Sequence, residues 1–493
     1  MLTQFKRLGR QVFVYGLGDT INKLIGILII PLFTRYLAPS DYGVFGVLTV
    51  AITLLVGICD FGLTSAISRF YHDEIESERL KMISTAQIVS VGITIVIAAF
   101  VFIFAQNVSL VLLKSAEYAY VVKLSFLTLP LNLLISAPLM KIRFEEKAKF
   151  YATFNIARVI LGIILNAVLV VFLGRGLNGL FESLVISLSL QAIFILIVTF
   201  RGNGFNFSKP LLKKMLIFGY PFILSSSSIW IIDWADRFIL ARLTDLSEAG
   251  LYSLGYNIGM GIMLPVGAFA FAWTPFFMSV AKKKNARKIY SFVGTYYALA
   301  IGFFVLILAV FCRDYFLLTP TKYQSAYNVT PLIAFSYAVQ GFFSITAIGA
   351  YIKKRPLQII LVQFVAMVVN MILMFLLIPK LNRMGAAWAT FGSYLSMSVL
   401  MLILSQKFYP IRFEYRRIIH VTVVGLGLYF LTSNIFQPSI GNLILRLGLI
   451  LTYPIILLVT GFFNLDEKKK IKVFGQNIIN ILKNRIGKNL NVK

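Results

Sequence analysis

Apolar side chains occur along this chain in runs of roughly 17–25 residues, the length that an α-helix needs to cross a bilayer. Segments that are charged or rich in Gly, Pro and Asn separate these runs. The strands of a membrane β-barrel are about half as long. The pattern therefore predicts fourteen membrane-spanning helices, at residues 12–34, 43–65, 84–105, 119–140, 151–173, 180–200, 215–241, 250–277, 290–312, 326–350, 357–378, 385–405, 418–436 and 442–463.

The composition supports this interpretation. Of the 493 residues, 59% are hydrophobic and only 13% are charged. A soluble globular protein has roughly 45–50% apolar and about 25% charged residues, so this chain lacks the charged surface that a water-soluble fold requires. We expect an all-α polytopic membrane protein.

The charges are strongly unbalanced. The chain has 47 Lys and Arg against 19 Asp and Glu, a net charge of +28. In a soluble protein this excess would suggest a nucleic-acid partner, but here most of it lies in the loops. If the N-terminus is cytoplasmic, 34 Lys and Arg fall on the cytoplasmic side and 8 on the other. Cytoplasmic loops of membrane proteins are enriched in Lys and Arg, so we predict that both termini are cytoplasmic and expect no nucleic acid.

Reactive side chains are scarce. The two cysteines, Cys59 and Cys312, lie within or at the ends of apolar runs, and the two histidines, His72 and His420, lie among charged residues. Their number and spacing fit neither a disulfide framework nor a metal site. We therefore expect no catalytic residues and no bound metal.

An internal repeat relates the two halves of the chain. Residues 35–45 read RYLAPSDYGVF, and residues 242–252 read RLTDLSEAGLY. At a constant offset of 207 residues, five of the eleven positions match: three are identical and two are similar, Asp with Glu and Phe with Tyr. Each copy follows one apolar run and opens the next, in the first hairpin of its half. Six predicted helices separate the copies, so both halves have the same orientation, as in transporters whose halves are related by an axis along the membrane normal.

The repeat and the loops suggest four parts. We predict an N-terminal lobe of six helices at 1–205, a C-terminal lobe of six helices at 206–410, an additional helix pair at 411–463, and a basic cytoplasmic tail at 464–493. The tail has apolar residues at helical spacing among lysines. It is either an amphipathic helix on anionic lipid headgroups or a solvated segment.

Charged residues within the apolar runs require a partner or a function, because each costs on the order of 2.5–3.5 kcal/mol at the bilayer centre. In the first run Asp19 and Lys23 are four residues apart. In the seventh run Asp233, Asp236 and Arg237 share one face of a helix. Residues four apart on a helix can pair, so we predict the pairs Asp19–Lys23 and Asp233–Arg237. For each pair, a structural ion pair and a role in substrate binding or ion coupling both remain open.

Arg158 is different, because no acidic residue lies within one turn of it in the fifth run. A guanidinium that faces a hydrated cavity can bind a phosphate through two parallel charge-assisted hydrogen bonds. At the cytoplasmic end of the second run lie Asp60 and Arg69. Arg69 is either an ordinary loop residue or the first contact for an anionic headgroup.

Three segments carry a family resemblance: GILIIPLFTRYLAPSDYGVFG at 26–46, the DFGL…SRF stretch from Asp60, and DWADRFILARLTDLSEAGLYSLG at 233–255. In order and spacing they resemble the bacterial polysaccharide flippases, the O-antigen and capsule exporters of the multidrug/oligosaccharidyl-lipid/polysaccharide exporter superfamily. This resemblance implies a MATE-like fold of two six-helix lobes in the bacterial cytoplasmic (inner) membrane. It also implies transport of undecaprenyl-pyrophosphate-linked oligosaccharides to the periplasmic leaflet by alternating access.

The resemblance further implies roles for individual residues. The cations that would bind the pyrophosphate or sugar are Lys23, Arg158, Arg237 and Arg69. The acidic residues for ion coupling or a structural pair are Asp19, Asp233 and Asp236, with Asp60 as a gate residue. No cofactor is expected beyond H⁺ or Na⁺ as the coupling ion. Expected partners are the lipid-linked glycan and anionic lipids at the cytoplasmic face, with polysaccharide polymerase machinery as a further candidate.

Two other functions compete with a flippase. A MATE-type multidrug antiporter has the same fold, but cationic drugs favour an acidic cavity, whereas five of the charges within these runs are basic: Lys23, Lys123, Arg158, Arg237 and Arg446. A membrane glycan polymerase or ligase would need a sizeable periplasmic loop, and the longest outer segments, 106–118 and 313–325, are short. We therefore predict a transporter rather than an enzyme.

Overall fold

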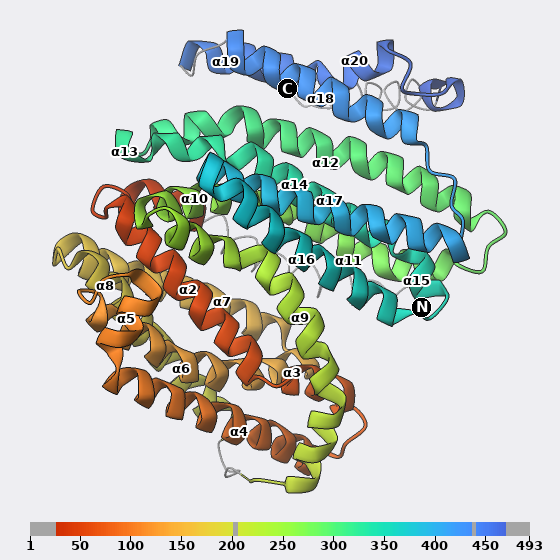
Figure 1. Cartoon of the computed structure of the whole chain (residues 1–493). Helices are drawn as coiled ribbons and strands as arrows, with labels where there is room; N and C mark the ends of the chain where they lie inside the picture. Colours follow the sequence, from red (N-terminus) through yellow and green to blue (C-terminus); the bar gives the residue numbers. More distant parts are fainter. Residues whose placement is uncertain (1–25, 201–205, 436–439, 470–493) are drawn as a thin grey trace, which may run out of the picture. The chain divides into compact units, whose positions relative to one another are not determined.

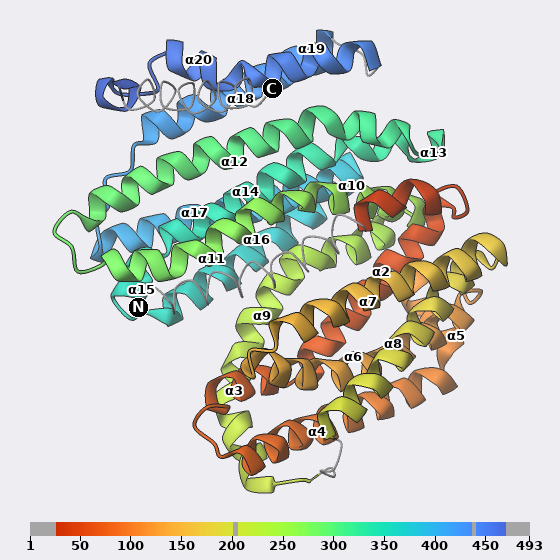
Figure 2. The ribbon, with the colours of Figure 1, turned by 180° about the vertical axis from the view of Figure 1, so that it is seen from behind.

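The computed structural model describes residues 26–200, 206–435 and 440–469, and every regular element in these ranges is a helix (Figures 1 and 2). The predicted all-α membrane fold class is confirmed. The helices of the N-terminal half are α2 (Pro39–Cys59), α3 (Leu63–Phe70), α4 (Glu76–Ile103), α5 (Ala105–Leu113), α6 (Ala119–Phe144), α7 (Ala148–Asn166), the π-helical η1 (Ala167–Phe172) and α8 (Gly176–Phe200).

The remaining elements follow the same alternation of long helices and short connections. They are α9 (Lys209–Leu243), α10 (Leu246–Gly259), η2 (Met260–Ile262), α11 (Met263–Val280), α12 (Ala286–Leu317), α13 (Thr321–Gln324), η3 (Ser325–Asn328), α14 (Thr330–Thr346), α15 (Ile348–Ile352), α16 (Pro356–Leu381), α17 (Arg383–Phe408), α18 (Tyr415–Ile435), α19 (Ile440–Leu451) and α20 (Tyr453–Val459).

Eleven helical stretches within the described residues are long and apolar enough to cross a membrane. Each coincides with one of the fourteen predicted runs. Of the other three runs, the first lies largely outside the described residues, and the seventh and thirteenth correspond to α9 and α18, which form helices but are not among the eleven. A multi-pass membrane protein is therefore shown, and the count of fourteen stays a prediction.

The helix boundaries reproduce the internal repeat. α2 begins at Pro39 and α10 at Leu246, and α8 begins at Gly176 and α17 at Arg383. Both pairs of starting residues are related by the offset of 207 found in the sequence. The repeat therefore extends beyond residues 35–45 and 242–252, because the starting residues of other helices are related by the same offset.

The first helices of the two copies are capped by complementary interactions. Before α2, the Asp41 carboxylate accepts a hydrogen bond from the backbone N–H of Ala38 at 2.7 Å. Before α10, the Asp245 carboxylate accepts one from the backbone N–H of Glu248 at 2.8 Å. These are the two halves of a capping box, which satisfies N–H groups that the first turn leaves unpaired.

The two copies also pack against each other, because α2 and α10 are neighbours in the fold. A Cβ atom on Gly43 would overlap the carbonyl oxygen of Leu246, and one on Gly250 would overlap that of Pro39. The offset of 207 converts each of these contacts into the other. A Cβ on Gly46 would lie 2.7 Å from Ser253 Oγ, and these two residues are themselves equivalent. The contact therefore has approximate two-fold symmetry.

Helix α9 connects the halves of the chain (Figure 1). Its N-terminal part supplies Leu211 and Met215 to a buried core that also contains Leu63 and Ile67 of α3. Its C-terminal part packs against α10, α16 and α17. The 35 residues of this helix therefore extend from one set of helices into the other without a loop.

The chain divides into two compact units, which differ from the predicted lobes. The first contains Met1–Ala281 and Cys312–Pro410, and the second contains Lys282–Phe311 and Ile411–Lys493. In the second unit, Arg417 pairs with Glu414 at 2.9 Å and with Glu467 at 2.8 Å. The lobe boundaries at 205 and 410 stay a prediction, and most of the tail from 464 lies outside the described residues.

Candidate functional site

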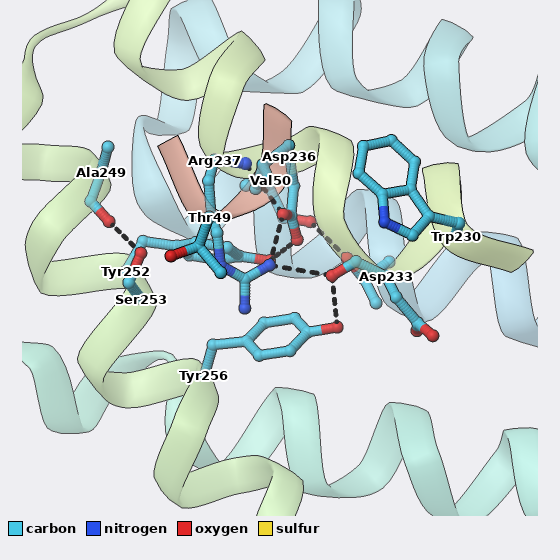
Figure 3. A network of polar contacts seen from close by, with 12 residues as sticks. Thr49, Val50, Trp230, Asp233, Asp236, Arg237, Ala249, Tyr252, Ser253 and Tyr256 are labelled. Atoms are coloured by element: carbon cyan, nitrogen blue, oxygen red, sulfur yellow. Dashed lines mark hydrogen bonds and ion pairs between the residues drawn. The ribbon is translucent and has the colours of Figure 1, made fainter. Parts of the chain in front are cut away.

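The acidic residues of α9 and Arg237 form one buried network in the first unit (Figure 3). Arg237 Nη1 lies 2.9 Å from Asp236 Oδ1 and donates a second hydrogen bond to the carbonyl oxygen of Asp233 at 2.8 Å. Only 2% of the Arg237 side chain and none of the Asp236 side chain is exposed. The Tyr252 hydroxyl of α10 donates a hydrogen bond to the other oxygen of Asp236. The ion pair of this helix therefore forms with Asp236 rather than with Asp233.

Aromatic rings enclose the Arg237 guanidinium. Its central carbon lies 4.1 Å from the ring centre of Tyr256 and 4.7 Å from that of Trp234. The negative face of an aromatic ring attracts a cation at these distances. Arg237 Nη2 has no hydrogen-bond partner among the described residues. The ion pair with Asp236 and the enclosing rings of Tyr256 and Trp234 indicate that Arg237 stabilises the fold.

The Asp233 carboxylate points to different helices. Its Oδ1 accepts hydrogen bonds from the hydroxyl of Tyr337 on α14, at 3.0 Å, and from the hydroxyl of Tyr394 on α17. The Tyr256 hydroxyl donates to the backbone carbonyl of Asp233 at 2.9 Å and lies 2.6 Å from the Tyr337 hydroxyl. Asp233 thus joins three helices through tyrosine hydroxyls, and no cation pairs with its carboxylate in the described part of the chain.

A further hydrogen bond connects α9 with α2. The indole N–H of Trp230 donates to Thr53 Oγ1 at 3.1 Å. Trp230 lies one turn before Asp233 on the same helix, and Figure 3 shows both residues in one view. The polar residues of α9 therefore form hydrogen bonds with helices from both halves of the repeat.

Arg158 lies elsewhere in the first unit, on α7, in the opposite kind of environment. Its side chain is exposed, and it has no ion pair or hydrogen bond to any described residue. It lines a cavity of about 260 Å³ between α7 and α8. The role of Arg158 in phosphate binding stays a prediction.

The cavity beside Arg158 is lined mainly by apolar side chains. Gln191 of α8 is the other strongly polar lining residue. The full lining consists of Phe150, Thr153, Phe154, Ala157, Arg158, Leu161, Leu190, Gln191 and Phe194. An apolar pocket with a few convergent polar groups is typical of a ligand site.

A second cavity of about 260 Å³ adjoins the first, since Phe150 lines both. Lys141 and Lys147 contribute its basic groups, and Glu145 pairs with Lys147 at 2.7 Å and with Lys141 at 3.7 Å. Thr199, at the end of α8, also lines it. Under the predicted topology this cavity lies at the cytoplasmic ends of the helices.

Of the other predicted site residues, Asp60 and Arg69 belong neither to the α9 network nor to the linings of the two cavities. Asp19 and Lys23 lie outside the described residues. Arg69 pairs with Asp73 at 2.7 Å, and both side chains are more than half exposed. Asp60 accepts a hydrogen bond from the backbone N–H of Thr64 at 3.2 Å, within the first turn of α3. The gate role of Asp60 and the headgroup role of Arg69 stay predictions.

Sequence reasoning missed the tyrosines of the network and the polar and aromatic lining of the Arg158 cavity. Gln191 carried a usable signal, because a polar side chain in the middle of an apolar run is costly and requires a partner or a function. The tyrosines carried none, since Tyr252, Tyr337 and Tyr394 come from three different helices and the first and last are 142 positions apart. Within the described residues there is no cluster of three or more His, Cys, Asp or Glu that could bind a metal.

These features define a multi-pass membrane protein with the architecture of a transporter: a duplicated set of helices, a buried polar network and a cavity with an unpaired cation. The polysaccharide biosynthesis protein family matches residues 8–281, more than half of the chain. The chain therefore belongs to this family, and the predicted family resemblance is confirmed.

Several curated proteins are similar in sequence. The succinoglycan biosynthesis transport protein ExoT of Rhizobium meliloti (strain 1021) is 25% identical over 228 residues, which are 45% of this chain and 44% of ExoT. The Lsg locus putative protein 1 of Haemophilus influenzae is 20% identical over 55% of this chain and 66% of its own length. The uncharacterized membrane protein MJ1068 of Methanocaldococcus jannaschii is 23% identical over 86% of this chain and 88% of its own length. The chain thus spans less than two thirds of the first two relatives.

Solved structures show the same fold at lower sequence identity. The lipid II flippase MurJ, in an inward closed conformation, superposes with a TM-score of 0.69 at 13% identity, over 91% of this chain and 98% of MurJ. An inward-facing multidrug resistance MATE family transporter superposes with a TM-score of 0.57 at 15% identity, over 79% and 97%. The predicted MATE-like fold is confirmed. The named activities among these proteins are transport and flipping, which agrees with a transporter rather than an enzyme.

Proposed function

We propose that the protein is a flippase for undecaprenyl-pyrophosphate-linked oligosaccharide repeat units. It moves them from the cytoplasmic to the periplasmic leaflet by alternating access, for the synthesis of O-antigen, capsule or a related surface polysaccharide. The polysaccharide biosynthesis family, the named role of ExoT in succinoglycan transport and the fold shared with a lipid II flippase support this substrate class.

The observation that carries the proposal is the state of Arg158. An arginine within an apolar helix is costly unless it is paired or functional, and Arg158 has no ion-pair partner among the described residues while it lines a cavity. A guanidinium can bind the oxygens of a phosphate through a bidentate contact. Arg158 is therefore the primary cation for the pyrophosphate, and Lys23, Arg69 and Arg237 are secondary candidates.

Ion coupling is assigned to the carboxylates of α9. Asp233 accepts hydrogen bonds only from tyrosine hydroxyls in the described part of the chain. A buried carboxylate that forms no ion pair responds strongly to a proton or a metal cation. We assign Asp233 the coupling ion, H⁺ or Na⁺, and assign Asp236 the role of counter-ion for Arg237. Asp19 remains a second coupling candidate.

The membrane and the partners follow from this function. The protein resides in the bacterial cytoplasmic membrane with both termini in the cytoplasm. Its basic cytoplasmic segments contact anionic lipids, and the polysaccharide polymerase machinery receives the exported unit.

The direct test is the location of the lipid-linked unit in cells from which the gene has been deleted. The unit should accumulate in the cytoplasmic leaflet, where its sugars are protected from a lectin added to spheroplasts. Restoring the gene on a plasmid should return the sugars to the outer surface. An unchanged leaflet distribution together with lost dye efflux would instead identify a multidrug antiporter of the MATE type, whose fold this chain shares.

A further inference from the structure

Aromatic rings form one wall of the cavity beside Arg158. Phe150, Phe154 and Phe194 stack on one another with ring centres 6.1–6.4 Å apart and with interplanar angles between 9° and 19°. Half of the Phe194 surface is exposed, whereas Phe154 is buried. A phosphate is a charged group that gains nothing from a stack of phenyl rings. The wall therefore indicates that another part of the ligand lies next to the phosphate.

The Gln191 amide indicates what this other part must contain. Gln191 is 6% exposed, and its Nε2 donates a hydrogen bond to Ser187 Oγ at 2.8 Å. Its Oε1 has no partner among the described residues, although a buried carbonyl without a donor is unfavourable. Phosphate diesters and hydrocarbon chains have no donor to offer. A ligand that carries an O–H or N–H group can donate to Gln191 Oε1.

Arg158 and Gln191 lie at the same depth in the helix pair. Gln191 lies a short distance before the end of α8 at Phe200, and Arg158 lies a similar distance after the start of α7 at Ala148. At a rise of 1.5 Å per residue, each distance is about 15 Å along its helix. Phe150 and Phe194 lie between these residues and the helix ends. The anionic group and the donor of the ligand thus occupy one level, and the aromatic wall extends from it toward the predicted cytoplasmic side.

The second cavity continues the same path. It shares Phe150 with the first and contains the Thr199 hydroxyl, which is buried and has no hydrogen-bond partner among the described residues. Lys141 and Lys147 lie in its wall. The polar lining beyond the aromatic wall suits hydroxyl-rich groups and does not suit a hydrocarbon chain.

We propose that the groove between α7 and α8 binds the sugar next to the pyrophosphate of the lipid-linked substrate. Arg158 binds the phosphate, the phenyl wall contacts the apolar C–H face of the sugar ring, and a sugar hydroxyl or N-acetyl N–H donates to Gln191 Oε1. The negative face of an aromatic ring attracts positively polarised C–H groups. This inference rests on the proposed function and adds that the protein distinguishes a glycosylated carrier from a bare one.

The test compares the binding of two carriers to the full-length protein in lipid nanodiscs. The probes are an isoprenyl diphosphate that bears one N-acetylated sugar and the same isoprenyl diphosphate without sugar, with inorganic pyrophosphate as a third arm. Gln191→Met preserves the side-chain volume and removes the acceptor. It should weaken binding of the glycosylated carrier by about tenfold, the effect of one lost hydrogen bond, and leave the bare carrier unchanged.

Two other variants complete the design. Phe194→Ala should reproduce the selective loss, whereas Arg158→Ala should weaken both carriers by about 10–100-fold, since it removes a charge-assisted contact. Gln87→Met is the matched control, because Gln87 is also buried in an apolar helix with an unpaired Oε1 but lines neither cavity. It should bind both carriers like the wild type.

The outcomes separate this inference from the proposed function. If Gln191→Met and Phe194→Ala affect both carriers equally, or neither, the sugar subsite is wrong while the flippase proposal stands. If the wild-type protein binds neither carrier, the proposed substrate class itself fails. Equal binding of pyrophosphate and the glycosylated carrier by the wild type would also overturn the sugar subsite.

Discussion

Arg158 and Arg237 are the same residue type in two apolar helices of one compact unit, and their surroundings are opposite. Arg237 is buried, paired with Asp236 and enclosed by the rings of Tyr256 and Trp234. Arg158 is exposed to a cavity and has no ion-pair partner among the described residues. One guanidinium has its charge neutralised within the fold, and the other keeps its charge available.

The difference shows that an intramembrane charge indicates a function only after its partners are known. Arg237 and Asp236 neutralise each other, so together they cost less than either charge alone. Arg158 remains costly until an anion binds, which is the property expected of a ligand site. Sequence spacing separated the two cases only in part, because it showed acidic neighbours for one arginine and none for the other.

The largest effect is expected from breaking the buried pair. Asp236→Ala leaves the Arg237 charge uncompensated and should lower the free energy of unfolding by about 3–5 kcal/mol. Thermal unfolding of the purified protein in detergent measures this loss. Arg158→Ala is the matched control, because it removes an exposed and unpaired arginine, and its stability should stay within about 0.5 kcal/mol of the wild type. Equal destabilisation by the two variants would contradict the proposed difference between the paired Arg237 and the unpaired Arg158.

The double variant Asp236→Leu/Arg237→Leu sharpens the same point. Replacing both members of a buried pair by apolar residues is often less harmful than removing one of them. We expect the double variant to unfold at a higher temperature than Asp236→Ala and to appear in the membrane at a normal level. A double variant that is less stable than the single one would show that the pair contributes more than neutralisation.

Arg158→Ala, which should leave stability almost unchanged, should have a large effect on export. Arg158→Ala should reduce surface polysaccharide by about 10–100-fold while the amount of protein in the membrane stays normal, because it removes a charge-assisted contact with the substrate. Arg158→Lys should restore part of the export, since an ammonium keeps the charge but not the bidentate geometry. Surface polysaccharide is quantified by antibody or lectin binding to whole cells. Normal export by Arg158→Ala would remove this residue from the site.

The smallest effect is expected at the hydroxyls around Asp233. Tyr394→Phe removes one hydrogen bond to the carboxylate and retains the ring, so stability should fall by about 1 kcal/mol. The dependence of export on the ion gradient should also shift, which a collapse of the H⁺ or the Na⁺ gradient would reveal. If export by this variant responds to both gradients as the wild type does, Asp233 is not the coupling residue.

The fold could be predicted to a large extent, because a bilayer permits few solutions for long apolar runs. The runs located the helices, but their ends were less accurate. The predicted run 250–277 is three consecutive elements from Leu246 to Val280, and α9 extends beyond 215–241 at both ends. Polar residues at helix ends remain helical where other helices or the interface support them, and hydropathy does not record this support.

The site could be predicted only where its determinants are local. The isolation of Arg158 is visible within one turn of sequence. The partner of Arg237 was not, because helical spacing favoured Asp233, whose carboxylate is instead occupied by hydroxyls from α14 and α17. The phenyl wall was invisible for another reason. With 44 phenylalanines in the chain, only their arrangement in the fold distinguishes three of them from the apolar background.

The self-complementary contact of Gly43 and Gly250 has a consequence for how the chemistry is distributed. It fixes one register for the whole duplicated scaffold, and in this register Arg158 corresponds to Val365 and Arg237 to Ile30. Neither arginine has a charged counterpart in the other copy. The two copies therefore differ in the charged side chains that their equivalent helices carry. In the proposed function this difference gives them separate tasks: the copy with Arg158 would bind the cargo, and the copy with Asp233 would bind the coupling ion.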